Sequence, residues 1–234
     1  MLVPETRQRY NADFMKMHLI LAGLLAFDYL QAQAALYSVG NVGNNNATSL
    51  NLAIPDGNPV GACSTLRVGG LGNSLSALTV TLNVSAGYNG DLYAYLSYNG
   101  TLVPLLNRVG TGSGDAIQNL FGYSTSGFNN VTLGDGGTSI HGVANPVSGT
   151  SYAPDGGSLA SFGGANPNGT WTLFFADLSG GATSTLQGWS LDITAVPEPV
   201  NVALAIFGGL LAVGSGIRRW SQSAPAIQEK KLHG

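Results

Sequence analysis

The sequence predicts an all-β protein: a single jelly-roll or β-sandwich domain, with an N-terminal signal peptide and one C-terminal transmembrane helix. Its 234 residues include 34 Gly and 10 Pro, and 44% are hydrophobic while 9% are charged. This composition is too apolar for a disordered chain and too rich in Gly for a helical one. Several segments alternate apolar and polar residues with a period of two, and the long apolar runs lie near the two ends.

Residues 1–34 are expected to form a leader that contains a signal peptide. A basic residue precedes an apolar run over 19–27, which is too short to cross a bilayer. Ala32 and Ala34 place small residues at the two positions that a signal peptidase reads, so we expect cleavage before Ala35. A shorter leader with a basic start would begin at one of two internal methionines, Met15 or Met17.

A polar linker is expected over 35–50 and the β-sandwich over 51–195. Five segments show the alternation of a half-buried strand, namely 78–84, 91–98, 101–106, 170–176 and 188–194. Asn-Gly pairs, which supply the positive φ of tight hairpin turns, precede the second and the third of these segments. The first three segments are therefore expected to form a meander. The absence of intervening helical patterns disfavours a parallel sheet.

The charge of the predicted sandwich excludes one class of partner. Residues 35–196 contain seven Asp, two Arg, and neither Lys nor Glu. Such a surface lacks the basic groups that neutralise phosphates, so nucleic acid is not expected as a partner. Cys63 is the single cysteine, which excludes an internal disulfide.

Three aspartates are candidate calcium ligands, because calcium prefers hard oxygen donors in loops rich in Gly and Asn. They are Asp91, Asp115 and Asp177. The favoured alternative is that each accepts hydrogen bonds from the backbone of its own turn. Calcium is therefore a possible ligand, and no cofactor is certain.

No complete catalytic site is expected. A serine protease needs a nucleophile, a base that a carboxylate orients, and an oxyanion site. His141 is the single His of residues 35–196, and it lies in a Gly-rich segment only two residues after Ser139. It is expected to be a solvated loop residue, and the protein is not expected to be an enzyme.

Tyr93 and Tyr95 are a candidate binding pair. They lie two residues apart, so they share one face of a strand, and aromatic faces stack on sugars or on protein groups. The favoured alternative is packing against neighbouring strands on the outer face of the sheet.

The C-terminal region is predicted to be a membrane segment. Residues 200–217 form an apolar run, and Arg218 and Arg219 follow it directly. The basic flank would remain cytoplasmic with the tail 221–234, so the residues between the two apolar runs would be exported. Two prolines before the run keep the backbone extended, in the tripeptide Pro197, Glu198 and Pro199.

This order of elements over 196–220 resembles the PEP-CTERM sorting signal of Gram-negative bacteria. The matching elements are the tripeptide, the apolar helix and the pair of arginines. The resemblance implies that an exosortase in the membrane processes the chain after the signal peptidase. It also implies a cell-surface or extracellular fate, with a polysaccharide matrix as a possible partner.

The sandwich resembles the P/Homo B domain of proprotein convertases. The matching segments include Ile54-Pro55-Asp56, Leu105-Leu106-Asn107-Arg108-Val109-Gly110, Asn166-Pro167-Asn168-Gly169-Thr170-Trp171 and Gly188-Trp189-Ser190-Leu191. In that family the jelly-roll module packs against a subtilisin-like catalytic domain and stabilises it. No such catalytic domain accompanies it in this chain.

Together these features predict an exported surface or matrix protein, first held in the membrane by its C-terminal helix, whose domain binds or scaffolds without catalysis. One alternative is an accessory module that stabilises a separate subtilisin-like serine endopeptidase. A second alternative is a carbohydrate-binding module that uses the face of Tyr93 and Tyr95.

Overall fold

A computed structural model describes residues 32–43, 47–112 and 120–197, together with residues 203, 204, 206–209 and 211. The chain divides into two units, of which Ala32–Val196 is one and the two terminal segments are the other. We describe each unit by itself.

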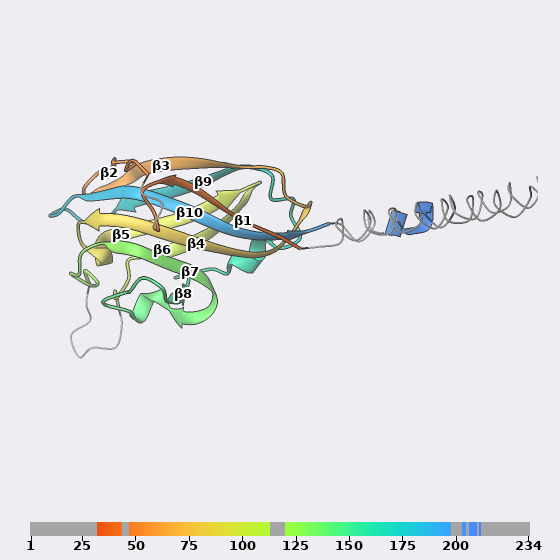
Figure 1. The fold of residues 1–234 in the computed structure, drawn as a ribbon. Coiled ribbons are helices and arrows are strands. Elements are labelled where there is room, and N and C mark those ends of the chain that lie inside the picture. The colour runs from red at the N-terminus through yellow and green to blue at the C-terminus, as the bar shows by residue number, and fades with distance from the viewer. Residues whose placement is uncertain are drawn as a thin grey trace, which may run out of the picture. The chain divides into compact units, whose positions relative to one another are not determined.

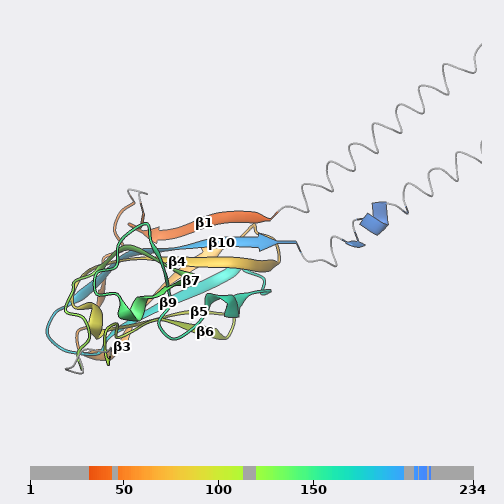
Figure 2. The ribbon, with the colours of Figure 1, turned by 90° about the horizontal axis from the view of Figure 1, so that it is seen from below.

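The unit Ala32–Val196 is all-β, as the sequence predicts, with two sheets that face each other (Figures 1 and 2). One sheet has the order β1-β10-β4-β7-β8, with β2 also paired to β10, and the other has the order β3-β9-β5-β6. The strands are β1 (Gln33–Gly40), β2 (Leu52–Ile54), β3 (Asn58–Val68), β4 (Ser74–Ala86), β5 (Leu92–Tyr98), β6 (Thr101–Asn107), β7 (Phe128–Ser139), β8 (Ser151–Ala153), β9 (Gly169–Asp177) and β10 (Ser184–Val196). Three short 3-10 helices connect them, η1 (Asn89–Asp91), η2 (Ile140–Gly142) and η3 (Leu159–Phe162).

The core lies between the sheets and explains why the alternating segments become strands. The inward residues of both sheets form a single apolar cluster. Trp171 of β9 and Trp189 of β10 are fully buried at its centre. Their indole nitrogens donate to the carbonyl of Pro167 and to the hydroxyl of Ser64, each at 2.9 Å. Each large apolar side chain buried here contributes about 1.5–3 kcal/mol.

The predicted meander does not form, although each predicted strand exists. β4 lies in the first sheet, whereas β5 and β6 form a hairpin in the second. The turn at Asn99 and Gly100 has the expected positive φ angles of 47° and 80°. After β4, however, the chain enters η1 and crosses to the other sheet. The alternation of residues predicts strands locally, but it does not determine which sheet each strand joins.

The segment expected to be a linker, 35–50, contributes most of an edge strand. β1 pairs with β10 along its whole length, from Gln33 opposite Ala195 to Gly40 opposite Gly188. Tyr37 packs against the core, and its hydroxyl donates to the carbonyl of Gly69. Edge strands bury only part of one face, which is why this segment lacks a clear alternation.

The predicted membrane anchor is corrected by the structure. In the part of the chain that the structure describes, no helix is long and apolar enough to cross a membrane. The expectation that a C-terminal helix holds the protein in a membrane is therefore not supported, and neither is the localisation that we built on it.

Several predicted processing sites fall at or beyond the edges of the described residues. Pro197 directly follows β10, whereas Glu198, Pro199, Arg218, Arg219 and most of the leader lie outside the described residues. Ala32 precedes β1 and Ala34 belongs to it, so cleavage before Ala35 would shorten this strand. The cleavage and the resemblance to a sorting signal stay predictions.

Candidate functional site

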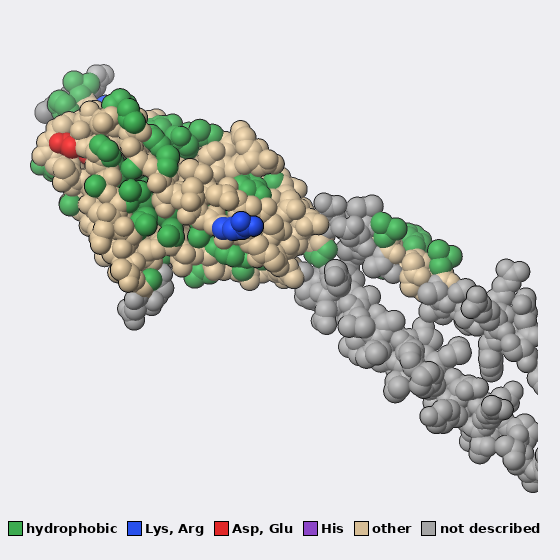
Figure 3. All heavy atoms as spheres, turned by 90° about the horizontal axis from the view of Figure 1, so that it is seen from above, with side chains coloured by type: hydrophobic (Ala, Val, Ile, Leu, Met, Phe, Trp, Pro, Cys, Tyr) green, Lys and Arg blue, Asp and Glu red, His purple; other side chains and the backbone are tan. Residues whose placement is uncertain are grey.

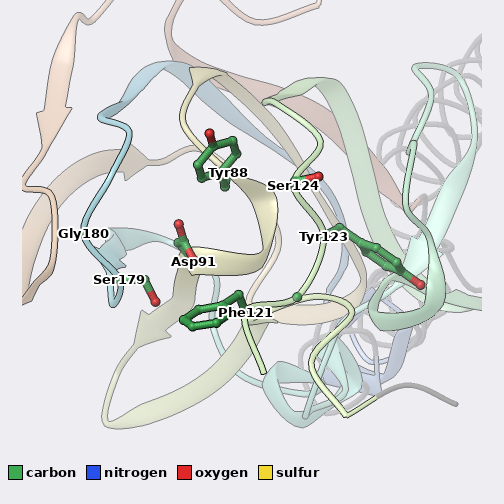
Figure 4. A pocket seen from close by; sticks show the side chains of 8 residues that line it. Tyr88, Asp91, Phe121, Tyr123, Ser124, Ser179 and Gly180 are labelled. Atoms are coloured by element: carbon green, nitrogen blue, oxygen red, sulfur yellow. The ribbon is translucent and has the colours of Figure 1, made fainter. Parts of the chain in front are cut away.

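A pocket of about 420 Å³ opens where η1 enters β5. It is bounded by the start of β5, by a loop that precedes β7 and by the turn that follows β9. Its lining residues are Tyr88, Asp91, Phe121, Gly122, Tyr123, Ser124, Ser179 and Gly180. In Figure 4 the carboxylate of Asp91 points into the space between Tyr88, Phe121 and Ser179, whereas the ring of Tyr123 points away.

Two predicted calcium ligands, Asp91 and Asp177, are brought close to each other, and Asp91 lines the pocket. Asp91 is 4% exposed and Asp177 is fully buried. They are neighbours because Asp177 pairs with Leu92 in the ladder between β9 and β5, and the N–H of Leu178 donates to the carbonyl of Asp91 at 2.8 Å. The third predicted ligand, Asp115, lies outside the described residues. Within the described ranges, no three His, Cys, Asp or Glu side chains form a metal-binding group.

The surroundings of both carboxyls favour the neutral acid. Burial raises the pKa of Asp91, while the Ser179 side chain and the charge of Arg108 lower it to a smaller extent. Burial also raises the pKa of Asp177, and the negative charges of Asp91 and Asp56 add to this rise, whereas backbone hydrogen bonds from Ser179 and Gly57 lower it. Arg108 reaches this region, since its Nε donates to the carbonyl of Gly90 at 3.3 Å and its Nη2 to the hydroxyl of Ser179 at 3.1 Å.

Two buried side-chain oxygens, one in η1 and one at the end of β9, have no hydrogen-bond partner. They are Oδ2 of Asp177 and Oδ1 of Asn89, whose side chain is 1% exposed. The hydroxyl of Thr125 donates to the carbonyl of Ala144, so it must accept from Nδ2 of Asn89, at 3.3 Å. This fixes the orientation of the amide and leaves Oδ1 unpaired. A buried polar atom without a partner costs about 1–3 kcal/mol, so each of these oxygens needs a water molecule or another group as its partner.

Four exposed apolar side chains either line the pocket or directly precede a lining residue in the sequence. We call Tyr88, Leu120, Phe121 and Leu178 the apolar rim. Phe121 and Leu120 are about 70% exposed, and the other two are roughly 40% exposed. Large apolar groups that gather around a pocket are typical of a binding surface, whereas isolated ones are ordinary.

His141 is not the solvated loop residue that the sequence predicts. It lies in η2, where Nδ1 is 2.7 Å from Oδ2 of Asp155 and Nε2 is 2.8 Å from the carbonyl of Thr111. Burial lowers the pKa of His141, but the hydrogen bonds to Asp155 and Thr111 and the charge of Asp155 together raise it above 6.5. The pairing of His141 with Asp155 was not predicted from the sequence.

The candidate pair Tyr93 and Tyr95 lies on the outer face of the second sheet. The ring of Tyr95 stacks on Phe174 of β9, with centroids 4.7 Å apart and an angle of 18° between the rings. Tyr93 meets Tyr95 edge to face, at 6.2 Å and 62°. A sugar needs an open aromatic face, and one face of Tyr95 is covered by Phe174. The geometry is that of packing across strands.

Charged groups are sparse over the rest of the sandwich. The face in Figure 3 shows hydrophobic and uncharged polar side chains with only small patches of charge. The buried carboxyls below the apolar rim are therefore a distinctive feature of a weakly charged molecule.

No family model and no curated protein matches the chain. Among solved structures, the chain is similar to the serine protease of Aeromonas sobria, at 18% sequence identity and a TM-score of 0.44, over 70% of this chain and 27% of that one. The complex of the same protease with its chaperone is also similar, at 18% sequence identity and a TM-score of 0.43, over 72% of this chain and 28% of that one. The chain thus spans less than a third of those chains. Likeness at this level carries no argument about activity or partners.

Proposed function

We propose that this chain is a non-catalytic binding module, a jelly roll of the P/Homo B type, that holds a protein partner at the apolar rim. The observation that supports it is the rim itself, four large exposed apolar side chains of which Tyr88 and Phe121 line the pocket. Such clusters supply the buried anchors of protein interfaces when a partner covers them.

The geometry of His141 supports a structural role instead of a catalytic one. Both ring nitrogens are engaged, one with the Asp155 carboxylate and the other with a backbone carbonyl. A general base needs a free nitrogen within reach of a nucleophile. His141 is the sole histidine of the described residues, so a Ser-His-Asp arrangement has no other candidate base there.

A protein partner is favoured over a sugar. One face of Tyr95 is covered by Phe174, and Tyr93 packs edge to face with Tyr95, which argues against the carbohydrate-binding alternative. The residues that carry the P/Homo B resemblance stabilise the fold itself. Asn168 binds both the N–H and the carbonyl of Leu71, and Trp171 fills the core. A subtilisin-like serine endopeptidase is the first partner to test, because the resemblance implies one.

The test mixes the full chain with a subtilisin-like protease domain that lacks its own C-terminal module, and follows residual activity on heating. We expect the chain to slow inactivation and a rim variant, Phe121→Asp with Leu178→Asp, not to do so. Leu36→Asp, which changes an equally exposed apolar residue on β1, is the matched control and should still protect. Equal protection by the control and the rim variant would contradict the proposed surface, and no protection at all would contradict this partner.

The absence of catalysis is tested on the chain alone. We expect no turnover of a mixture of fluorogenic peptides. Turnover that disappears in His141→Gln would contradict the proposal, because it would show that His141 leaves its two hydrogen bonds to act as a base.

A further inference from the structure

We infer that His141 is a pH-dependent switch for the apolar rim: its charged ring holds the segment that follows β6, and its neutral ring releases that segment. The inference concerns the regulation of the surface described above, and its consequence for a partner rests on the proposed function. The switch itself lies within this chain and needs no partner.

Both ring nitrogens of His141 face oxygen atoms that accept hydrogen bonds. Nδ1 is 2.7 Å from a carboxylate oxygen of Asp155, and Nε2 is 2.8 Å from the carbonyl oxygen of Thr111. A neutral imidazole carries one N–H and can donate to only one of these oxygens. The imidazolium ion carries two N–H groups and donates to both. The observed arrangement is therefore that of the charged ring.

Loss of the ring proton breaks the contact with Thr111. The remaining proton stays on Nδ1, because the carboxylate of Asp155 is a stronger acceptor than a backbone carbonyl. The lone pair of Nε2 would then face the carbonyl oxygen of Thr111 across 2.8 Å, and the two would repel each other. The side chain of His141 is 29% exposed, so its proton can exchange with solvent. Deprotonation therefore moves the segment of Thr111 away from the ring.

Asp155 is the charged group that faces the ring. Among the strands near η2, β6 carries no ionisable side chain, and the carboxylate of Asp135 in β7 accepts from backbone N–H groups of η3. The hydroxyl of Tyr152 in β8 accepts from a backbone N–H. The guanidinium of Arg108 donates to the hydroxyl of Ser179, on the side of the pocket. The other ionisable groups are thus engaged elsewhere.

The direction of the switch follows from the charge on the ring. Burial lowers the pKa of His141, but the hydrogen bonds to Asp155 and Thr111 and the charge of Asp155 together raise it above 6.5. The stabilisation by the charged ring is complete below the unfolded pKa of about 6.5 and is lost as the pH rises through the folded pKa. The rim is therefore held at low pH and released at high pH.

The segment that His141 holds also binds the loop that carries Leu120 and Phe121. The carbonyl of Val109 accepts from the N–H of Tyr123 at 3.0 Å. Nη2 of Arg108 donates to the carbonyl of Leu120 at 3.2 Å. These two hydrogen bonds lie on either side of Phe121 in the chain. A displacement of the segment after β6 therefore displaces this part of the rim.

The experiment follows amide hydrogen exchange of the full chain by NMR between about pH 5.5 and 8.5, with every rate corrected for the intrinsic effect of pH. We expect the protection of the Tyr123 amide to fall about tenfold as the pH rises, with the same midpoint as the titration of the His141 ring nitrogens. The amide of Gly164, which donates to the carbonyl of Leu75 at 2.8 Å, is the control and should keep its protection.

Two variants separate titration of the ring from a purely structural role. His141→Gln has no ionisable ring, so the protection of the Tyr123 amide should no longer depend on pH. Asp155→Asn keeps the ring but removes the charge that favours its protonation, so the midpoint should move down by about one pH unit. Asp155→Asn keeps the test decisive if His141→Gln does not fold, because an unchanged midpoint would overturn the inference.

A fluorine label reports on the rim directly. With 4-fluorophenylalanine at position 121, we expect the fluorine resonance to move with the midpoint of His141 and to stay fixed in His141→Gln. The inference is overturned if the label and the Tyr123 amide do not respond while His141 titrates, or if His141→Gln keeps the pH dependence of the wild type. These measurements need no partner, so they succeed or fail separately from the protease test of the proposed function.

Discussion

The molecule contains two polar clusters, each built on a 3-10 helix, and they differ in how well they are satisfied. At η2, the ring of His141 contacts the carboxylate of Asp155 and the carbonyl of Thr111. The carboxylate of Asp155 also accepts a hydrogen bond from the N–H of Asn107 at 3.2 Å. At η1, Asp177 and Asn89 each keep a buried oxygen without a partner. A satisfied cluster fastens the fold, whereas an unsatisfied one is stable only if something else supplies the missing contacts.

The two clusters hold the same segment from both sides. Arg108 reaches the η1 cluster through its bond to the carbonyl of Gly90. Two residues later, the N–H of Gly110 donates to the carbonyl of His141 at 2.9 Å, and the carbonyl of Thr111 accepts from the His141 ring. The segment that follows β6 therefore contacts both clusters. A substitution in one cluster can alter the other through this segment.

The largest expected effect is at Gly90 of η1. A Cβ on Gly90 would clash with the carbonyl oxygen of Phe121 and the backbone nitrogen of Tyr123, and rigid backbone cannot move aside cheaply. We expect Gly90→Ala to lower the free energy of unfolding by about 3 kcal/mol, measured by urea denaturation. Gly142 of η2 has open space around the same position, so Gly142→Ala should change it by less than about 0.5 kcal/mol. Equal costs would show that the close approach at η1 does not exist.

A smaller effect is expected at the satisfied cluster. Asp155→Ala removes the acceptor of Nδ1 of His141 and of the N–H of Asn107. Hydrogen bonds to charged groups contribute about 1.5–3 kcal/mol, so we expect a loss of about 2 kcal/mol near pH 6. Asp192→Ala, at an exposed position, is the control and should be nearly neutral. If Asp192→Ala lowered the free energy of unfolding as much as Asp155→Ala, the pair of His141 and Asp155 would have no special stabilising role.

The pH dependence of the same pair gives a weaker signal with a definite sign. The pKa of His141 is raised in the folded state, so the protonated ring is favoured by folding. Its contribution is complete below the unfolded pKa of about 6.5 and disappears as the pH rises through the folded pKa. We therefore expect stability to fall as the pH rises from about 6.5 through the folded pKa, by less than the cost of Asp155→Ala. His141→Gln should flatten this part of the profile, and an unchanged slope would contradict the assignment.

The strands were predictable because alternation is a local property. The segments 170–176 and 188–194 lie within β9 and β10, since inward residues such as Trp171 and Trp189 recur at every second position. The assignment of β4 and β5 to different sheets was not predictable. It depends on close packing of η1 against the loop at Phe121, a contact between residues far apart in the sequence.

The candidate site shows the same limit. Asp91 and Asp177 are recognisable as oxygen donors from their residue type, but the register of Leu92 opposite Asp177 brings them together. Asn89 was read only as a turn residue, because nothing in the sequence reveals that its side chain is buried with one amide oxygen unpaired. Partners across strands, such as Phe174 beside Tyr95, are hidden for the same reason.

The smallest expected effect comes from the buried acid that lacks a partner. In the absence of divalent cations, we expect Asp177→Asn to change the free energy of unfolding by less than about 0.5 kcal/mol, or to increase it. Asparagine keeps an Oδ1 that can accept from the N–H of Ser179, as Asp177 does at 3.3 Å. Its new amide group would replace the unpaired Oδ2 beside the carboxylate of Asp91, so a buried charge is exchanged for a donor.

Comparing Asp177→Asn with Asp155→Asn distinguishes an unsatisfied cluster from a satisfied one, because both variants make the same chemical change. At Asp155 the carboxylate already serves two donors, and the neutral amide would weaken its pairing with protonated His141, so this variant should lose stability in metal-free buffer. Urea denaturation of both variants in a chelator measures the difference. If Asp177→Asn proved the more damaging, the carboxylate of Asp177 would stabilise the fold without any ion. The unsatisfied cluster would then be a structural one, like the cluster at η2.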